Sequence, residues 1–420
     1  MIRLHPFLIF PICFTVIYTG FSARILPLEK ALTGGCFILI ICFAAGLPKR
    51  GAIPTWCALT AIHSAMLFLP LLHYDTIRLP WVLSSFVTYS SVAAFSVFAL
   101  KLSDQGNVTF FRYYLASLAL AMICAPAALF LFNAPRFEPP AFFLIAFVLV
   151  WFAHIRGRKA VLALVIILAL AFASQVRINL LICLGFAGIL SITRIRHPQT
   201  RLIFLTLTGI AFIWFIPSLP YLSEGHLPGL RRLSKIMTVD GFYTEVILRR
   251  SLELHAAWGA FTSASPFEIL FGHGHGASYP ARLLLLDLSA EHGSVAWRFT
   301  ENSDAFVLHF GPMRLLYRTG ILGLLLFTIP VILAAKHGIL FLVNPRNPAN
   351  TAEFWMHVCS LAALMWLGKF MISPAETDIG FCISVGGSLA LAYKTRRGNF
   401  TIFNHNQKPQ SKVPARFQPS

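Results

Sequence analysis

The sequence predicts an all-α polytopic membrane protein, with about twelve transmembrane helices and one large loop on the outer face between helices nine and ten. The chain has 420 residues, of which 57% are hydrophobic and only 12% are charged, and its mean hydropathy is +0.72. A soluble domain of average composition carries roughly 25% charged residues, so this composition argues against a soluble fold. The apolar residues also fall in long blocks, as helices that cross a bilayer require.

About twelve apolar segments approach the length of roughly twenty residues that a membrane-crossing helix needs. They are predicted at 6–23, 31–47, 52–72, 80–100, 113–133, 139–155, 160–175, 178–193, 202–220, 311–335, 352–372 and 378–394. No A-x-A-like cleavage site follows the first segment, which indicates an uncleaved span rather than a signal peptide. The predicted organisation is helices one to nine in 1–220, the outer loop in 221–308, helices ten to twelve in 309–395 and a disordered basic tail in 396–420.

The distribution of basic residues predicts the orientation of these helices, because cytoplasmic loops carry an excess of Lys and Arg. The even-numbered connections and the tail are basic, through Lys49, Arg50, Lys101, Arg112, Arg156, Arg158, Lys159, Arg194, Arg196, Arg201, Lys336, Arg346, Lys394, Arg396 and Arg397. The short odd-numbered connections hold only Arg24, Lys30, Arg78, Arg136 and Arg177. Both termini are therefore expected in the cytoplasm. The net charge of +18 is interpreted as membrane orientation and contact with anionic lipids, and no nucleic acid partner is expected.

The connection from Tyr221 to Leu308 differs from all the others in its length. It contains nine of the sixteen acidic residues and seven Arg or Lys residues. Long loops are translocated largely regardless of their charge, so this basic content is compatible with the outer face. A loop of this length is usually functional. Within it, TEVILRRSLELHAAWGAF has apolar residues at helical spacing, which predicts a short helix.

Three arginines on the outer face are candidates for binding an anion. Arg177 lies in ASQVRIN, at the turn between two short apolar helices. It is either a snorkelling residue at a helix end or a ligand for a phosphate group at the membrane surface. Arg249 and Arg250 are adjacent, and adjacent residues point about 100° apart on a helix. One of them can face a ligand while the other faces water, although a solvated helix face would explain both.

The stretch HFGPMRLLYRTGILG places His309, Arg314 and Arg318 where an apolar helix begins. Charged groups at the edge of a membrane span are costly to bury and often functional. Arg314 and Arg318 are four residues apart and share one helical face. Histidine can accept a proton near neutral pH, so His309 suits general-base catalysis. A polar helix cap is the more common role for a histidine in this position.

Metal and nucleotide sites are not predicted. The segment GHGHG at 272–276 offers two histidines but no third ligand, so its glycines are interpreted as turn formers. All eight cysteines lie in apolar segments, which argues against a disulfide framework and against a Cys-based metal site. The sequence has neither a GxxxxGK[ST] phosphate loop nor a D-x-D pair, and no cofactor is expected.

Taken together, these motifs resemble the O-antigen ligase and polymerase superfamily of bacterial inner-membrane glycosyltransferases. ASQVRINLL resembles its S-x-R turn, and LRRSLELHAAWGAF followed by SPFEILFGHGHG resembles its loop arginine segment and P-x-x-x-G-x-G-x-G. HFGPMRLLYRTGILG resembles its H-N-x-x-L-x-x-L-x-x-x-G-x-x-G, with Phe310 in place of the asparagine. His309 stands eleven residues before Gly320, as in the family, and Gly323 completes the pattern. The resemblance covers 160–335 by motif and the remainder by hydropathy.

The resemblance implies a metal-independent transfer of a preassembled glycan from undecaprenyl diphosphate to a lipid A–core sugar hydroxyl, on the periplasmic face of the inner membrane. In this family the late-helix histidine would deprotonate or orient the acceptor hydroxyl, which assigns that role to His309. Arg177 and Arg250 would bind the diphosphate of the donor. Arg249 competes with Arg250 for one family position, and the spacing favours Arg250.

Two further residues are suggested by this sequence rather than by the family. Arg314 and Arg318 would add positive potential at the same site. The resemblance itself implies that the apolar spans provide a groove for the polyprenyl chain. A repeat-unit polymerase, or a ligase with a protein or another polysaccharide as acceptor, shares these motifs and is the first alternative. A polysaccharide flippase or transporter is the second. Transporters are often built from repeated halves and carry charged groups near the midplane, whereas here the long loop is off-centre and Lys369 is the main charge within a span.

Overall fold

The computed structural model describes residues 54–67, 79–131, 142–154, 159, 162, 165–166, 177–194, 206, 249–274, 310–346, 348–371 and 379–396. Every regular element in this part of the chain is an α-helix, which confirms the all-α prediction for the described residues. The predicted spans at 6–23 and 31–47 lie outside the described residues, and so do nearly all of those at 160–175 and 202–220. The number of twelve spans therefore stays a prediction.

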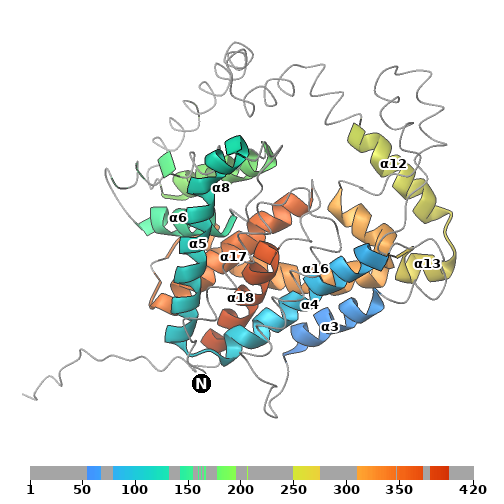
Figure 1. Cartoon of the computed structure of the whole chain (residues 1–420), viewed down its shortest axis with the longest axis horizontal. Coiled ribbons are helices and arrows are strands. Elements are labelled where there is room, and N and C mark those ends of the chain that lie inside the picture. The colour runs from blue at the N-terminus through green and yellow to red at the C-terminus, as the bar shows by residue number, and fades with distance from the viewer. Residues whose placement is uncertain are drawn as a thin grey trace, which may run out of the picture.

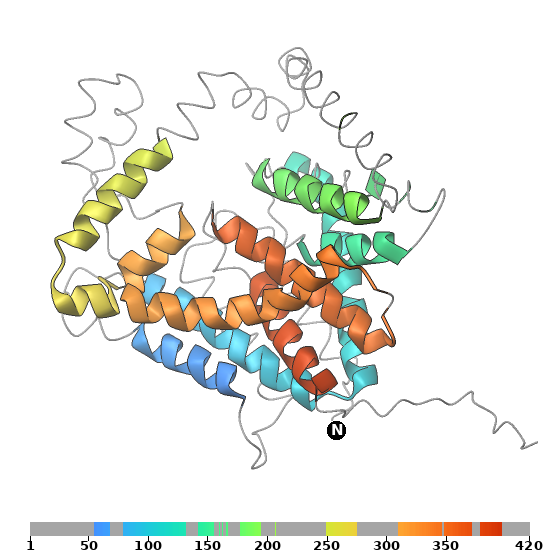
Figure 2. The ribbon, with the colours of Figure 1, turned by 180° about the vertical axis from the view of Figure 1, so that it is seen from behind.

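Ten helices form the described part of the fold: α3 (Thr55–Met66), α4 (Leu79–Lys101), α5 (Asp104–Leu131), α6 (Phe142–His154), α8 (Arg177–Arg194), α12 (Arg249–Thr262), α13 (Pro266–Phe271), α16 (Gly311–Val343), α17 (Thr351–Phe370) and α18 (Ile379–Arg396). Eight of them coincide with predicted spans, and α12 is the helix predicted within the long loop. In Figures 1 and 2, α4, α16, α17 and α18 occupy the centre of the molecule, with α5, α6 and α8 on one side and α12 and α13 on the other.

The helix α5 begins at Asp104, nine residues before the span predicted from apolar residues alone. Its polar first turns are held by neighbouring helices. The side-chain amide of Asn107 donates to the Ala99 carbonyl at 3.0 Å, and Lys394 Nζ lies 2.7 Å from the Leu102 carbonyl and 3.6 Å from the Asp104 carboxylate. The polar start of α5 is therefore stabilised by the ends of α4 and α18.

The helix α16 continues to Val343, eight residues beyond its predicted end. Gly338 lies within this extension, and a Cβ atom at this position would lie 2.6 Å from the Ser360 carbonyl of α17. The glycine lets the two helices pack backbone to backbone through this region, as small residues do in membrane helix pairs. Residues 321–343 alone span ~35 Å at 1.5 Å per residue, and the hydrocarbon layer of a bilayer is about 30 Å thick.

The outward face of α16 is apolar along this whole length. The exposed large hydrophobic residues recur at helical spacing, at Ile321, Leu322, Leu325, Ile329, Ile332, Leu333, Ile339, Leu340 and Val343. Among the described residues, α16 is the one helix both long enough and apolar enough to cross a membrane, and Ser85–Lys101 and Phe142–His154 are shorter apolar helices. A continuous apolar face of this kind is costly in water. These features indicate association with a membrane.

The core between the central helices is held by small residues and by hydrogen bonds between helices. Ser360 and Ser388 hydroxyls lie 2.6 Å apart, and Ser388 also donates to the Ala334 carbonyl at 2.8 Å, so that α16, α17 and α18 are joined at one point. Ser96 of α4 donates to the Gly386 carbonyl of α18 at 3.2 Å. Such polar contacts between closely packed helices are characteristic of membrane bundles.

Seven helix ends meet at one end of this bundle, which we call the basic end. They are joined by contacts between Trp56 and Tyr393, Lys394 and Asp104, Lys394 and Leu102, His154 and Phe341, Phe341 and His357, and Thr395 and Met356. These are the N-terminal ends of α3, α5 and α17 and the C-terminal ends of α4, α6, α16 and α18. The basic end carries Lys101, Arg112, Lys336, Arg346, Lys394 and Arg396. At the opposite end, Gly311 of α16 lies against Phe370 of α17.

Replacing Gly338 by alanine should weaken the contact between α16 and α17. The added methyl group would meet the Ser360 and Leu361 backbone, and overpacking of this kind costs about 1–3 kcal/mol. Thermal unfolding of the purified protein in detergent should show a lower Tm for Gly338→Ala than for the wild type. Gly188→Ala in α8 is the matched control, because nothing lies within 4 Å of a Cβ atom there. Equal Tm values for the two variants would contradict the proposed packing.

Candidate functional site

A break at Gly320 divides α16 into two parts. Gly320 has φ 65° and ψ −171°, which is not helical. The residues before it, 311–319, form a short arm that is tilted away from the long part of the helix in Figures 1 and 2. In an uninterrupted helix the carbonyls of Tyr317 and Arg318 would accept from residues 321 and 322. The break removes these donors, so both carbonyls need others.

The glycine-rich loop after α13 supplies the missing donors. The backbone N–H of His273 donates to the Tyr317 carbonyl at 2.9 Å, and that of Gly274 donates to the Arg318 carbonyl at 2.9 Å. Gly272 and Gly274 have φ values of 80° and 95°, a conformation that favours glycine, while His275 and Gly276 of the predicted turn lie outside the described residues. The His273 ring stacks on Tyr317 with centroids 4.3 Å apart, and its Nε2 lies 3.5 Å from Glu268 Oε1.

The loop and the broken helix approach so closely that both contact positions require glycine. A Cβ atom on Gly272 would overlap the Arg318 carbonyl group, and a Cβ atom on Gly320 would overlap the Leu270 carbonyl group. Both overlaps involve backbone atoms, which cannot rotate away. Together with their positive φ values, they give a physical reason for glycine at both positions.

The short helix α13 is held in place by a capping box. The Glu268 N–H donates to Ser265 Oγ at 3.3 Å, and the Ser265 N–H donates to Glu268 Oε2 at 2.7 Å, with Pro266 in the first turn. The sequence S-x-x-E before an apolar run is a known signal for a helix start, so it could have predicted α13. The same glutamate contacts His273, which connects the cap to the glycine-rich loop.

The arm of α16 and the adjoining end of α17 carry buried positive charge. Arg314 and Arg318 are 6% and 4% exposed, so the two residues predicted to share a helical face are both buried. Lys369 of α17 is 7% exposed, and its Nζ lies 5.0 Å from the Trp366 ring centroid and 5.9 Å from that of Phe142. Burying a cation is costly, and aromatic faces offset only part of that cost. We call this region, with the loop at 272–274, the kink corner.

The other predicted site residues begin helices that pack against α16. Arg177 is the first residue of α8, and Arg249 and Arg250 are the first two of α12. Both helices contact α16, and α8 also contacts α17 (Figure 1). The side chains of these arginines lie outside the described residues, and so does His309, which directly precedes the first described residue of this segment. Their convergence on one site therefore stays a prediction.

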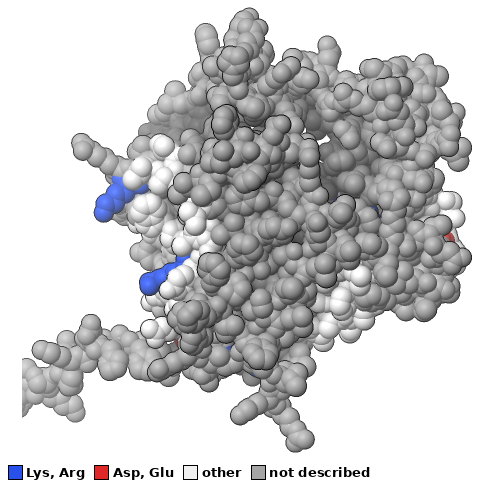
Figure 3. Space-filling view, viewed as in Figure 1, with Lys and Arg blue, Asp and Glu red and all other residues white. Residues whose placement is uncertain are grey.

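The described residues hold no cluster of metal-ligating side chains. Within these residues no group of three or more His, Cys, Asp or Glu side chains could hold a metal ion, while His275 of the GHGHG segment lies outside them. On the face in Figure 3, the exposed described Lys and Arg side chains lie at the left edge, where Figure 1 shows α5 and α6. The positive charge of the kink corner is buried instead.

Comparison with known proteins adds no family assignment. No protein-family model matches the chain, and no curated protein matches it in sequence.

Replacing Gly320 by alanine should displace α13 from α16. An alanine in this backbone conformation costs roughly 1–3 kcal/mol, and its methyl group would meet the Leu270 and Phe271 backbone. Limited proteolysis of the purified protein, followed by mass spectrometry, should show faster cleavage within residues 263–275 than in the wild type. Gly259→Ala in α12 is the control, because a Cβ atom there meets nothing within 4 Å. Cleavage of Gly320→Ala at the wild-type rate would show that the loop does not depend on the break.

Proposed function

We propose that the chain is an O-antigen ligase-like glycosyltransferase of the bacterial inner membrane. It would move a preassembled glycan from undecaprenyl diphosphate to a lipid A–core sugar hydroxyl on the periplasmic face. The observation that carries the proposal is the docking of Gly272 and Gly274 on the break at Gly320. The loop motif and the late-helix motif of the resemblance are 44 residues apart between His273 and Tyr317, yet they are in direct backbone contact.

The arrangement of the two ends of the bundle supports a periplasmic site. The helix ends that the positive-inside rule assigns to the cytoplasm gather at the basic end. The kink corner belongs to the opposite ends of α16 and α17. A site there would be reached from the periplasm, with both termini in the cytoplasm.

The proposed chemistry follows from the residues on the α16 arm and on the helices that pack against it. Arg177 and Arg250 would hold the donor diphosphate by charge-assisted hydrogen bonds, with Arg249 as the alternative to Arg250. Buried Arg314 and Arg318 would strengthen the positive potential that this anion experiences.

In the proposed reaction, His309 would accept the proton of the acceptor hydroxyl while its oxygen attacks the anomeric carbon. The bond from that carbon to the diphosphate oxygen breaks, and its electron pair leaves with undecaprenyl diphosphate. The arginines stabilise the charge that develops on this leaving group. A diphosphate is already a good leaving group, so the step requires no metal ion.

Replacing His309 by alanine should abolish transfer without preventing membrane insertion. A strain that lacks the chain would be complemented with wild type, His309→Ala or His255→Ala, and lipopolysaccharide would be profiled on gels. His255 is an exposed histidine of α12 and serves as the matched control. Wild type and His255→Ala should restore the long ladder, whereas His309→Ala should leave short lipid A–core bands at equal protein level. A full ladder from His309→Ala would show that His309 is not the catalytic base.

The same gels separate the alternative functions. Accumulation of long lipid-linked glycan in the deletion strain would support a ligase, whereas accumulation of single lipid-linked repeat units would support a polymerase. A ladder unchanged by the deletion would exclude lipid A–core as the acceptor and favour another acceptor or a transporter. Comparing Arg249→Ala with Arg250→Ala would identify which arginine binds the donor, because only that variant should lose transfer.

Chelation should leave transfer intact. In vitro transfer from the lipid-linked donor should proceed at the same rate in EDTA as in buffer with added Mg²⁺, because arginines rather than a metal ion would neutralise the diphosphate. Detergent-solubilised protein and purified donor provide the measurement, with His309→Ala as the inactive control. Loss of transfer in EDTA, restored by a divalent metal, would contradict the proposed mechanism.

A further inference from the structure

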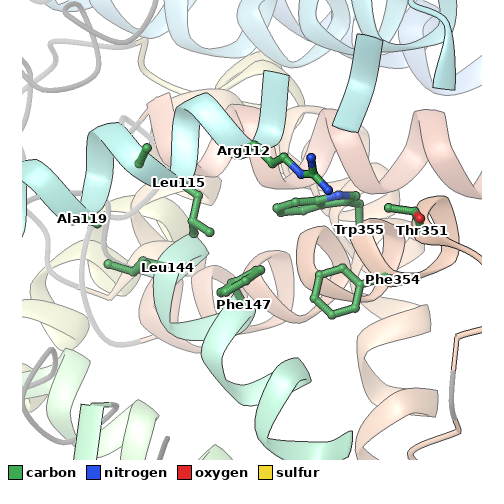
Figure 4. Close-up of a pocket in the computed structure, with 9 residues that line it drawn as sticks. Arg112, Leu115, Ala119, Leu144, Phe147, Thr351, Phe354 and Trp355 are labelled. Atoms are coloured by element: carbon green, nitrogen blue, oxygen red, sulfur yellow. The ribbon is translucent and has the colours of Figure 1, made fainter. Parts of the chain in front are cut away.

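A groove lies between α5, α6 and α17, and its polar residues are at the basic end of the bundle. Its volume is about 400 Å³, and the residues that line it include Arg112, Leu115, Ala119, Leu144, Thr351 and Trp355. Figure 4 shows these side chains arranged around an open space. Apart from Arg112 and Thr351, the lining is apolar. The volume is within the range of pockets that bind small molecules or parts of larger ones.

The polar groups lie at one end of the groove. Arg112 is near the start of α5, and Thr351 is the first residue of α17, so both belong to the basic end. Ala119 is seven residues further along α5, which places it about 10 Å deeper in the bundle. Figure 4 shows the Arg112 guanidinium beside the Trp355 indole and near Thr351, with Leu115, Ala119 and Leu144 toward the other end. The groove thus has a polar mouth and an apolar interior.

The groove opens to the medium that surrounds the bundle. Next to its lining residues, Tyr113 and Leu120 of α5 are 49% and 57% exposed. Large apolar side chains exposed along a helix of a membrane bundle face lipid. The Arg112 side chain is itself exposed and forms no hydrogen bond or ion pair with another described residue. Its guanidinium can therefore bind an anionic group that arrives from the lipid layer.

We propose that this groove binds one anionic phospholipid. Arg112 would hold the phosphate by charge-assisted hydrogen bonds, the Thr351 hydroxyl would donate a further one, and part of an acyl chain would fill the space toward Ala119 and Leu144. Basic pockets between transmembrane helices on the cytoplasmic side are suited to anionic lipid headgroups, and the charge pattern assigns the basic end to that side. The proposal does not depend on the reaction at the kink corner.

Native mass spectrometry of the full chain tests the proposal. The detergent-solubilised, delipidated protein would be titrated with phosphatidylglycerol or with zwitterionic phosphatidylcholine. The wild type should retain one phosphatidylglycerol at an about tenfold lower lipid concentration than phosphatidylcholine, and Arg112→Ala should lose that preference. Arg396→Ala is the matched control, because Arg396 is an exposed cation of the same end that does not line the groove, and it should behave as wild type.

A second pair of variants tests the acyl-chain part of the groove. Ala119→Trp should fill the interior and weaken retention of both lipids about tenfold, whereas Leu120→Trp, on the neighbouring exposed position, should not. If Ala119→Trp does not give a monodisperse, folded protein, the lipid retention of Arg112→Ala compared with that of Arg396→Ala tests the proposal by itself. Equal phosphatidylglycerol retention by Arg112→Ala and wild type would overturn the proposal. Displacement of the lipid by millimolar inorganic phosphate would also overturn it, because the site would then bind free phosphate.

Discussion

The carbonyl groups of Tyr317 and Arg318 lose their helical donors where α16 breaks, and the backbone of residues 273–274 replaces them. An unsatisfied backbone group away from water costs several kcal/mol, so a helix can break in this way only where other groups donate to the freed carbonyls. Gly320 and Gly272 make that approach sterically possible. The direction of the 311–319 arm, and thus the placement of its buried arginines, depends on this one contact between loop and helix.

The remainder of the described bundle provides a rigid support for the arm. The long part of α16 packs along α17, and Gly338 permits backbone contact between them near the basic end. Serine hydroxyls connect α16, α17 and α18 within the core. Because α17 also carries Lys369 and Phe370 at the kink corner, one helix connects the two functional regions that we propose, the glycan-transfer site and the lipid groove.

Much of the helical fold could be predicted from the apolar segments and from the basic residues that lie between them, because both are local properties of the sequence. The predicted spans at 80–100, 178–193 and 378–394 agree with α4, α8 and α18 to within a few residues. Larger differences arise where polar residues are stabilised by other helices. Asn107 bonds to the end of α4 where α5 begins earlier than its apolar residues indicate, and Gly338 packs on α17 in the part of α16 that extends beyond its predicted end.

The sequence by itself determined the helical class, the presence of a long apolar helix and the glycine positions of the loop and late-helix motifs. Each of these follows from local composition, because a segment in hydrocarbon must satisfy its own backbone as a helix. Only the tertiary structure decided that Gly320 breaks α16, that Arg314 and Arg318 are buried, and that Arg112 borders a groove with Trp355. These features depend on contacts between segments far apart in the chain. The φ value of Gly320 and the burial of the two arginines therefore cannot be predicted from the residue types alone.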